Sequence, residues 1–270
     1  MAFDLASISS ETCLKAPRIL VLGVEKIGKT TFAADSNEPI FCPIKSEKGA
    51  DNVLLPKFKS GQTVPQFPAC NTMDDLRSCF STLWEETHSY QTIVIDSASA
   101  LQPLVFEEVC KDHGVKHIDK VLKGYNKGQN IALNTWQSIT DTLDLFREER
   151  NISSIIIGHV RIKRFDDPIA GSYDSYEFDL DKHAAAHFYR WADAILFCNT
   201  KTAVTKEDVG YKKEIGRADD IAGDQRFLYT KNRPAHPGGG RGPFGQLPYE
   251  LPMPKDNPFG AWMAAVAQVS

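Results

Sequence analysis

The feature that most constrains the fold of this sequence is the segment Gly-Val-Glu-Lys-Ile-Gly-Lys-Thr, from Gly23 to Thr30. It fills every fixed position of the pattern G-x-x-x-x-G-K-[ST]. The apolar run Arg18–Gly23 before it predicts a buried strand, and the composition of Lys29–Asp35 predicts a helix. A glycine-bounded turn between a strand and a helix is the setting in which this pattern forms a phosphate-binding loop.

The chemistry of phosphate binding requires this arrangement of residues. Glycines let the backbone curl, so that successive N–H groups point inward at a helix N-terminus and form an anion site. The Lys29 side chain is predicted to reach the β- and γ-phosphates, and the Thr30 hydroxyl to ligate Mg²⁺. We therefore predict ATP and Mg²⁺ as cofactors. The predicted nucleotide-binding residues are Gly23, Val24, Glu25, Lys26, Ile27, Gly28, Lys29, Thr30 and Thr31.

The composition is that of a folded chain with one domain and short appendages. The 270 residues are 42% apolar and 24% charged, close to the average of globular proteins, which excludes wholesale disorder. The formal net charge is −4, so a nucleic-acid partner would have to be met by a local basic patch.

Three features indicate where the protein works. Its six cysteines are scattered without a C-x-x-C pair, which is typical of reduced thiols in a cytosol. The N-terminal residues lack a basic region followed by an apolar one, so no signal peptide is predicted. No stretch approaches the ~18–20 apolar residues that span a bilayer. We therefore expect a cytoplasmic protein with no membrane partner.

Apolar runs alternate with helical patterns along the chain. Buried strands are predicted at 18–23, 39–44, 92–96 and 151–160, and shorter strands at 194–197, 201–205 and 226–229. Helices are predicted at 29–35, 73–88, 101–122, 129–150, 183–192 and 259–269, and loops at 51–72, 161–176 and 235–243. This alternation predicts an α/β fold with a mainly parallel sheet, helices on both faces and extra C-terminal strands.

A second acidic element follows the phosphate loop. The run Ile93-Val94-Ile95-Asp96 is an apolar strand that ends in a carboxylate. Strand ends of a parallel sheet meet at one edge, so Asp96 is expected beside the loop. We predict that Asp96 holds Mg²⁺ together with Thr30, through a water molecule.

The end of this strand is similar to the equivalent strand of RecA-like recombinases, in the run Ile95-Asp96-Ser97-Ala98-Ser99-Ala100-Leu101 with Pro103 just beyond. Arg190–Asp193 and the turn Gly124–Gln129 match the same group. Taken together, the chain resembles the RecA-like P-loop ATPases carried by bacteriophages, a group that includes AAA-domain single-strand annealing proteins with a RecA core. The resemblance implies an ATPase domain at 17–252, after a lead-in at 1–16 and before a C-terminal extension with a short helix at 253–270.

The resemblance also assigns roles to four residues. Ser97 occupies the position at which many P-loop ATPases carry a catalytic glutamate. In RecA-like proteins the catalytic glutamate comes instead from the end of the strand after the P-loop helix, where this chain has Glu47. Glu47 is thus the implied base that orients the attacking water. His159, after the strand Ser153–Gly158, resembles the sensor of the γ-phosphate. Lys231 and Arg233 resemble the basic pair that reaches a neighbour's ATP, which implies a homo-oligomer, either a ring or a filament.

Two clusters of basic and aromatic residues are candidates for contacting single-stranded DNA. The first cluster, Arg161, Lys163, Arg164 and Phe165, begins the predicted loop after His159, and the second comprises Lys123, Tyr125 and Lys127. Cations neutralise phosphates and rings stack on bases, a combination that suits a single strand. The alternative is a solvated surface, because several acidic residues follow the first cluster closely.

Three functions remain open on the sequence alone. The first is an ATP-hydrolysing RecA-like protein of a phage or prophage, which acts on single-stranded DNA in recombination or annealing in the bacterial cytoplasm. Its expected partners include phage recombination proteins and single-strand-binding proteins. The second is the ATPase core of a helicase or helicase loader. The third is a nucleotide-gated module that binds protein and no DNA.

Overall fold

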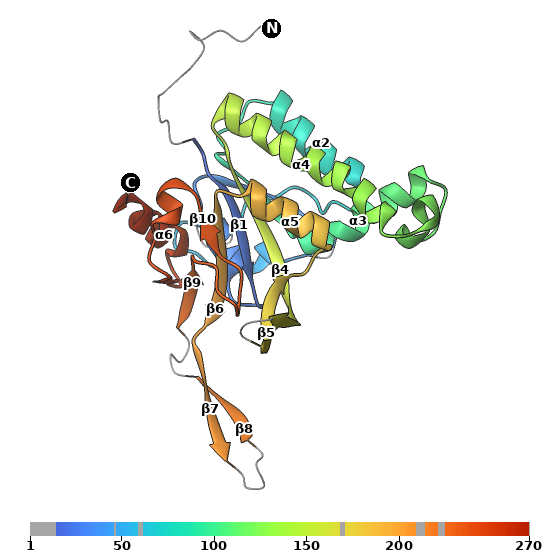
Figure 1. The fold of residues 1–270 in the computed structure, drawn as a ribbon. Helices are drawn as coiled ribbons and strands as arrows, with labels where there is room; N and C mark the ends of the chain where they lie inside the picture. The colour runs from blue at the N-terminus through green and yellow to red at the C-terminus, as the bar shows by residue number, and fades with distance from the viewer. Residues whose placement is uncertain are drawn as a thin grey trace, which may run out of the picture.

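A mainly parallel β-sheet forms the centre of the computed structural model, which describes residues 15–45, 47–58, 62–167, 171–208, 214–220 and 225–269. The parallel strands follow the order β6-β1-β4-β3-β2 across the sheet (Figure 1). They are β1 (Arg18–Gly23), β2 (Pro39–Pro43), β3 (Thr92–Asp96), β4 (Ser153–Asp167) and β6 (Ala194–Thr200). The antiparallel strands β9 (Arg226–Tyr229) and β11 (Glu250–Pro252) extend the sheet beyond β6, and β10 (Gly239–Gly240) also pairs with β6.

Helices cover both faces of this sheet, which confirms the predicted α/β class. Strands β1, β2 and β3 are buried along nearly their whole length, as parallel strands between two helical layers must be. The helices are α1 (Lys29–Ala34), α2 (Met73–Glu85), α3 (Ala98–Asp112), α4 (Lys127–Arg150), α5 (Lys182–Trp191) and α6 (Pro258–Ala267). Short 3-10 turns lie at Ala50–Asn52, Ile118–Lys123 and Gly242–Gly245.

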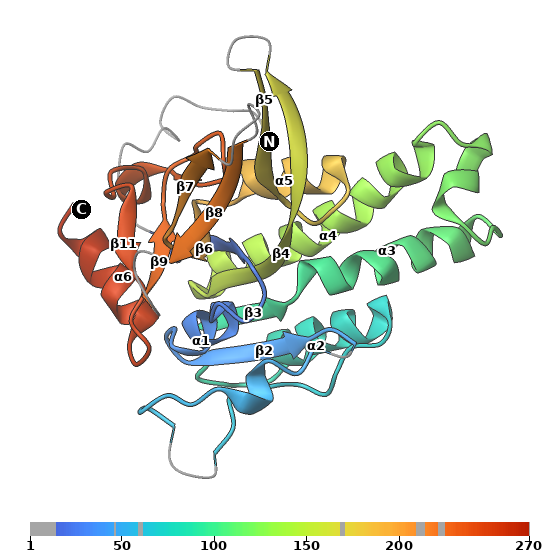
Figure 2. The same ribbon diagram turned by 90° about the horizontal axis from the view of Figure 1, so that it is seen from below.

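Alternation along β1 divides the core into two layers. Ile19 and Val21 face a cluster that includes Phe32 of α1 and Trp262 of α6, whose rings lie 5.9 Å apart. Leu20 and its alternate neighbour Leu22 belong to the opposite cluster, to which α2, α3, α4 and α5 contribute. Figure 2 shows α1 and α6 on one side of the strands and α3, α4 and α5 on the other. The two layers hold the carboxyl ends of β1, β3 and β4 at one edge.

Two antiparallel ribbons project from the sheet. The polar segment 161–176 was predicted to be a loop, and this is wrong: β4 continues to Asp167 and pairs with β5 (Gly171–Phe178). The physical reason is a set of cross-strand pairs, such as Phe165 with Tyr173, whose ring centroids lie 5.5 Å apart. The second ribbon consists of β7 (Thr202–Asp208) and β8 (Glu214–Asp220). Both ribbons point away from the helical layer of α2 and α4 (Figure 1).

Two further predictions of secondary structure need correction. The helix predicted at 101–122 ends at Asp112, because Gly114 adopts a left-handed φ of 62° and the chain turns. The loop predicted at 235–243 contains the short strand β10. Most of the predicted lead-in, residues 1–14, lies outside the described residues. Among the helices that the structure describes, none combines the length and the apolar character needed to cross a membrane.

Candidate functional site

The Gly23–Thr30 segment forms a tight turn between β1 and α1, as predicted. Gly28 adopts a φ of 105° at the start of α1, a conformation that L side chains rarely adopt. A Cβ atom at Gly28 would lie 2.3 Å from Nη1 of Arg226. The backbone conformation therefore favours glycine at this position, and the end of the flexible Arg226 side chain lies directly beside it.

The Lys29 side chain closes this turn from within. Its Nζ donates hydrogen bonds to the carbonyl oxygens of Gly23 and Val24, both at 2.8 Å, and the residue is 5% exposed. Burial lowers the pKa of the Lys29 ammonium. Both acceptors are neutral carbonyl groups, so an anion bound in the turn would supply the charge that this buried cation lacks.

The side-chain oxygens of Thr30 and Asp96 lie together beside the turn. The Thr30 hydroxyl donates to Asp96 Oδ2 at 3.0 Å, and Asp96 is 4% exposed. Burial, together with the nearby Glu47 carboxylate, raises the pKa of Asp96 to about 6. A hydroxyl and a carboxylate suit Mg²⁺, whose charge would offset the cost of burying the ionised Asp96.

Strand register brings His159 to the same edge. Strand β4 lies between β1 and β3, so His159 is the partner of Gly23, and Asp96 is the partner of Ile157. The backbone N–H of His159 donates to Ser99 Oγ at 3.1 Å, which fixes the end of the strand against α3. Parallel pairing thus places the predicted sensor next to the start of the phosphate loop.

Glu47 joins His159 and Ser97 through one carboxylate oxygen. Oε1 of Glu47 lies 3.2 Å from His159 Nε2 and 3.1 Å from the Ser97 hydroxyl. The hydrogen bond with His159 lowers the pKa of Glu47, so the carboxylate is ionised. His159 Nδ1 is buried and has no hydrogen-bond partner among the described residues. Nε2 therefore carries the proton that Glu47 accepts, and Nδ1 remains available to a bound group.

These residues line one cavity of about 640 Å³, a volume in the range of ligand pockets. The structure thus brings together the predicted residues of the phosphate loop, Glu47, Asp96 and His159. The lining residues are Glu25, Lys26, Gly28, Lys29, Thr30, Thr31, Glu47, Gly49, Asn52, Asp96, Ile157 and His159.

Lys231 and Arg233 lie outside this cavity, in the loop between β9 and β10. The chain leaves the sheet after β9 and returns at β10. The two ends of the intervening Lys231–Gly238 loop lie close together, since a Cβ atom at Gly238 would lie 2.6 Å from the Lys231 carbonyl oxygen. Lys231 Nζ donates to the Gly245 oxygen, and the Arg233 guanidinium lies 4.8 Å from the centre of the Tyr249 ring. Neither cation is among the described residues that line the cavity around Lys29 and Asp96.

The first predicted DNA cluster lies on the β4–β5 ribbon, where it is divided between two faces. Strand alternation places Arg161, Lys163 and Phe165 on one face and Arg164 on the other. Arg161 pairs with Asp179 and Lys163 with Glu177, each at 3.2 Å, so the ribbon neutralises part of its own charge. Phe165 stays 46% exposed.

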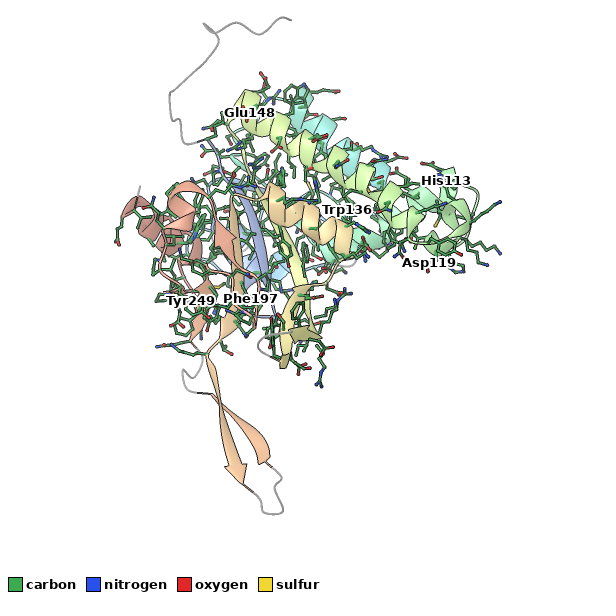
Figure 3. All side chains as sticks on the ribbon, in the orientation of Figure 1. His113, Asp119, Trp136, Glu148, Phe197 and Tyr249 are labelled. Atoms are coloured by element: carbon green, nitrogen blue, oxygen red, sulfur yellow. The ribbon has the colours of Figure 1, made fainter. Side chains whose placement is uncertain are left out.

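The second predicted DNA cluster lies at the tip formed by the end of α3, the Ile118–Lys123 turn and the start of α4, separate from the ribbon (Figure 1). Figure 3 labels His113 and Asp119 in this region. Tyr125 is 93% exposed, and Lys123 and Lys127 are exposed as well. The structure therefore places the two predicted clusters on separate surfaces, each with an exposed ring.

Three residues of the site were missed by reasoning from the sequence. Arg226 Nη1 donates to the Ile27 oxygen at 3.1 Å and braces the phosphate loop from β9. Gly49 packs against Thr30, since a Cβ there would lie 2.7 Å from the Thr30 hydroxyl oxygen. Ser97 belongs to the run that resembles RecA-like recombinases, but its hydrogen bond with Glu47 was not predicted. Arg226 carries no signal in the sequence, whereas Gly49 closes the segment that contains Glu47, and a glycine there indicates a close approach of the backbone to another group.

Comparison with known proteins identifies one family. A family model described as AAA domain matches residues 15–242. None of the curated proteins matches the chain. Among solved structures, the chain is similar to one described as the crystal structure of the RadB recombinase, at 13% identity, with 90% of each chain covered and a TM-score of 0.43. Because the family model spans most of the sequence, from the residues before β1 to those after β10, this chain belongs to the AAA domain family of nucleotide-binding ATPases.

Proposed function

We propose that the protein is a Mg²⁺-dependent, RecA-like ATPase of a phage or prophage that acts on single-stranded DNA in recombination or strand annealing. One observation carries the ATPase part: the cavity at the carboxyl edge of β1, β3 and β4 contains Lys29, Thr30, Asp96, Glu47 and His159 together. The ATPase domain would comprise residues 17–252, with the last residues as an extension.

Each side chain of the cavity has a distinct task in hydrolysis. The loop N–H groups and Lys29 bind the β- and γ-phosphates. Glu47, ionised and held by His159 and Ser97, orients the attacking water and accepts its proton. His159 would sense whether the γ-phosphate is present and transmit this to Glu47 through their hydrogen bond. Mg²⁺, held by Thr30 and Asp96, would neutralise charge on the phosphates.

Two cations outside the cavity suggest how copies of the chain cooperate. Lys231 and Arg233 lie away from their own nucleotide cavity, which suits a role at the cavity of a neighbouring subunit. Such a contribution in trans requires a ring or a filament. Isolated subunits would then hydrolyse ATP slowly, because the transition-state charge would lack one cation.

The β4–β5 ribbon is the candidate for gripping DNA. Strand β4 of the ribbon contains His159 as well as Lys163 and Phe165, and Tyr173 lies opposite Phe165 on β5. Single-stranded DNA bound to these side chains would therefore contact the same ribbon that carries the sensor. Phosphates would contact the cations, and bases would stack on the rings. The cluster Lys123, Tyr125 and Lys127 offers a second contact.

One experiment tests the proposal: the ATPase rate of the full chain with and without a single-stranded oligonucleotide. We expect stimulation by DNA, and loss of turnover with retained nucleotide binding in Glu47→Gln, by about 10²–10⁴-fold, as for other general bases. Lys231→Ala and Arg233→Ala should lower only the rate of the assembled state. Full turnover in Glu47→Gln removes the base assignment. Equal rates per site in dilute monomer and in DNA-bound assemblies contradict the role in trans.

A nucleotide-gated module that binds protein is the second candidate, because Arg161 and Lys163 are already paired with acids of the ribbon. It predicts no salt-sensitive DNA affinity with or without ATP. A helicase or helicase loader would instead displace a DNA strand from a forked duplex, and a strand-displacement assay with the same protein tests this.

A further inference from the structure

The Lys231–Gly238 loop is fastened to the β4–β5 ribbon at its base. The Tyr176 N–H, on the outer edge of β5, donates to the Ala235 oxygen at 2.8 Å. In the ribbon register Tyr176 lies opposite Ile162, so its side chain belongs to the face that does not carry Arg161 and Lys163. The loop thus contacts the ribbon at the outer edge of β5, and it is the opposite face, here called the cationic face, that carries Arg161 and Lys163.

A row of rings joins the ribbon to Arg233. Tyr176 packs on Phe197 with ring centroids 5.2 Å apart, and Phe197 stacks on His236 at 4.8 Å with an interplanar angle of 9°. His236 stacks in turn on Tyr249 at 5.9 Å, and the Arg233 guanidinium lies over that same ring. Figure 3 labels Phe197 and Tyr249. The cation and the ribbon are therefore the two ends of one packed array.

His236 is the centre of this array and uses every polar group it has. It is 6% exposed, its Nδ1–H donates to the Pro237 oxygen, and its Nε2 accepts from the Tyr249 hydroxyl, both at 2.9 Å. Its backbone N–H and oxygen exchange two hydrogen bonds of 3.1 Å with those of Arg233. Burial lowers the pKa of His236, so the ring is neutral and keeps this pattern of one donor and one acceptor.

We propose that His236 is a positioning residue that couples occupancy of the ribbon by single-stranded DNA to the placement of Arg233. This inference rests on the proposed function and specifies how that site is regulated. Single-stranded DNA bound on the cationic face changes the angle of the ribbon. Tyr176 moves with the ribbon, and the stacked rings transmit this movement to Arg233. Closely packed rings transmit such movement because they have few alternative arrangements.

Two variants of different severity test the proposal. His236→Leu removes both polar contacts and the stacking, whereas Tyr249→Phe removes one hydroxyl and preserves the packing. His88→Leu is the matched control, because His88 also packs on a tyrosine, at 5.4 Å from Tyr90, and bonds a carbonyl, at 2.9 Å from Leu83. Each full-length variant is measured for hydrogen exchange of the loop amides and for turnover, with and without an oligo-dT strand.

In the wild type we expect oligo-dT to change exchange at Arg233 and His236. In His236→Leu the exchange response and the stimulation of turnover by DNA should both fall at least about fivefold, which is the lower end of measured coupling between sites. The dissociation constant for DNA should change less than about twofold. Tyr249→Phe should be intermediate and His88→Leu normal. DNA binding that protects the ribbon but leaves the loop unchanged overturns the coupling and leaves the proposed function standing. If the wild type binds no DNA, both fail together.

Discussion

Glu47 Oε1 lies 3.2 Å from Nε2 of His159, although the two residues are 112 positions apart in the chain. This contact joins the segment after β2 to the end of β4 and fixes the carboxylate that we assign as the base. Because the hydrogen bond with His159 lowers the pKa of Glu47, it also sets the pH above which that base is ionised.

Loss of this contact should shift the pH dependence of hydrolysis. In His159→Leu the pKa of Glu47 rises, so the acidic limb of the kcat profile should move to higher pH, with kcat about tenfold lower at neutral pH because the base is less well oriented. His159→Gln keeps a donor and should restore much of the profile. An unshifted limb in His159→Leu would show that the contact does not control the base.

Removal of the buried lysine should abolish tight nucleotide binding. Among the described residues, the Lys29 ammonium donates hydrogen bonds to the Gly23 and Val24 carbonyls and to no carboxylate, so it can reorient to a phosphate without losing an ion pair there. Charge-assisted hydrogen bonds contribute ~1.5–3 kcal/mol, so Lys29→Ala should weaken ATP binding by about 10–100-fold. Calorimetry measures this loss. The exposed Lys26 in the same loop is the control, and Lys26→Ala should have a smaller effect.

The ligand-free protein should become more stable when Asp96 loses its charge. Its folded pKa of about 6 lies above the ordinary value of 3.8, so the folded state binds more protons between those values. The stability that the folded state gains by binding this proton is fully present below pH 3.8 and is lost as the pH rises through 6.

Asp96→Asn should therefore raise the free energy of unfolding at pH 8 without Mg²⁺, by about 1–3 kcal/mol from the size of the pKa shift, while weakening Mg²⁺-dependent nucleotide binding. Thermal unfolding at pH 5 and pH 8 checks the sign, since the gain should shrink at pH 5. A variant that is less stable at pH 8 would contradict the assigned shift.

Arg226 should act on nucleotide affinity from outside the cavity. Its guanidinium donates to the Ile27 oxygen at 3.1 Å, within the loop whose N–H groups we propose to bind the phosphates. Arg226→Ala should lower ATP affinity about fivefold to tenfold, because the loop loses one charge-assisted hydrogen bond and becomes less ordered. Lys255→Ala, a nearby exposed cation, is the control. Equal affinity in Arg226→Ala would show that the loop is ordered without it.

Local patterns were sufficient to predict one half of the site. The phosphate loop and the strand that ends in Asp96 are short continuous segments, and burial of β1 and β3 follows from their apolar runs. Their meeting at one edge follows from parallel pairing, which the alternation of strands and helices predicts. These parts of the fold were therefore accessible without a structure.

The other half depends on contacts between distant segments. The Glu47 contact with His159 requires the strand order that places β4 between β1 and β3, which no local pattern encodes. The β4–β5 ribbon was predicted as a loop because charged residues on both of its faces hide the alternation of a half-buried strand. Arg226 reaches the loop from 199 residues away.

Charge pairing on the ribbon gives the sharpest test of DNA binding. Lys163 is held by Glu177 at 3.2 Å, so Glu177→Gln should free this cation and tighten binding of oligo-dT, whereas Lys163→Ala should weaken it. The slope of log affinity against log salt should become shallower by ~0.7 in Lys163→Ala, as expected for one lost phosphate contact on a single strand. Phe165→Ala should weaken binding by ~1–3 kcal/mol with an unchanged slope, because stacking releases no counterions. Fluorescence anisotropy over a range of salt concentrations separates these outcomes. If Glu177→Gln and Lys163→Ala both leave the affinity unchanged, the strand does not lie on this face of the ribbon.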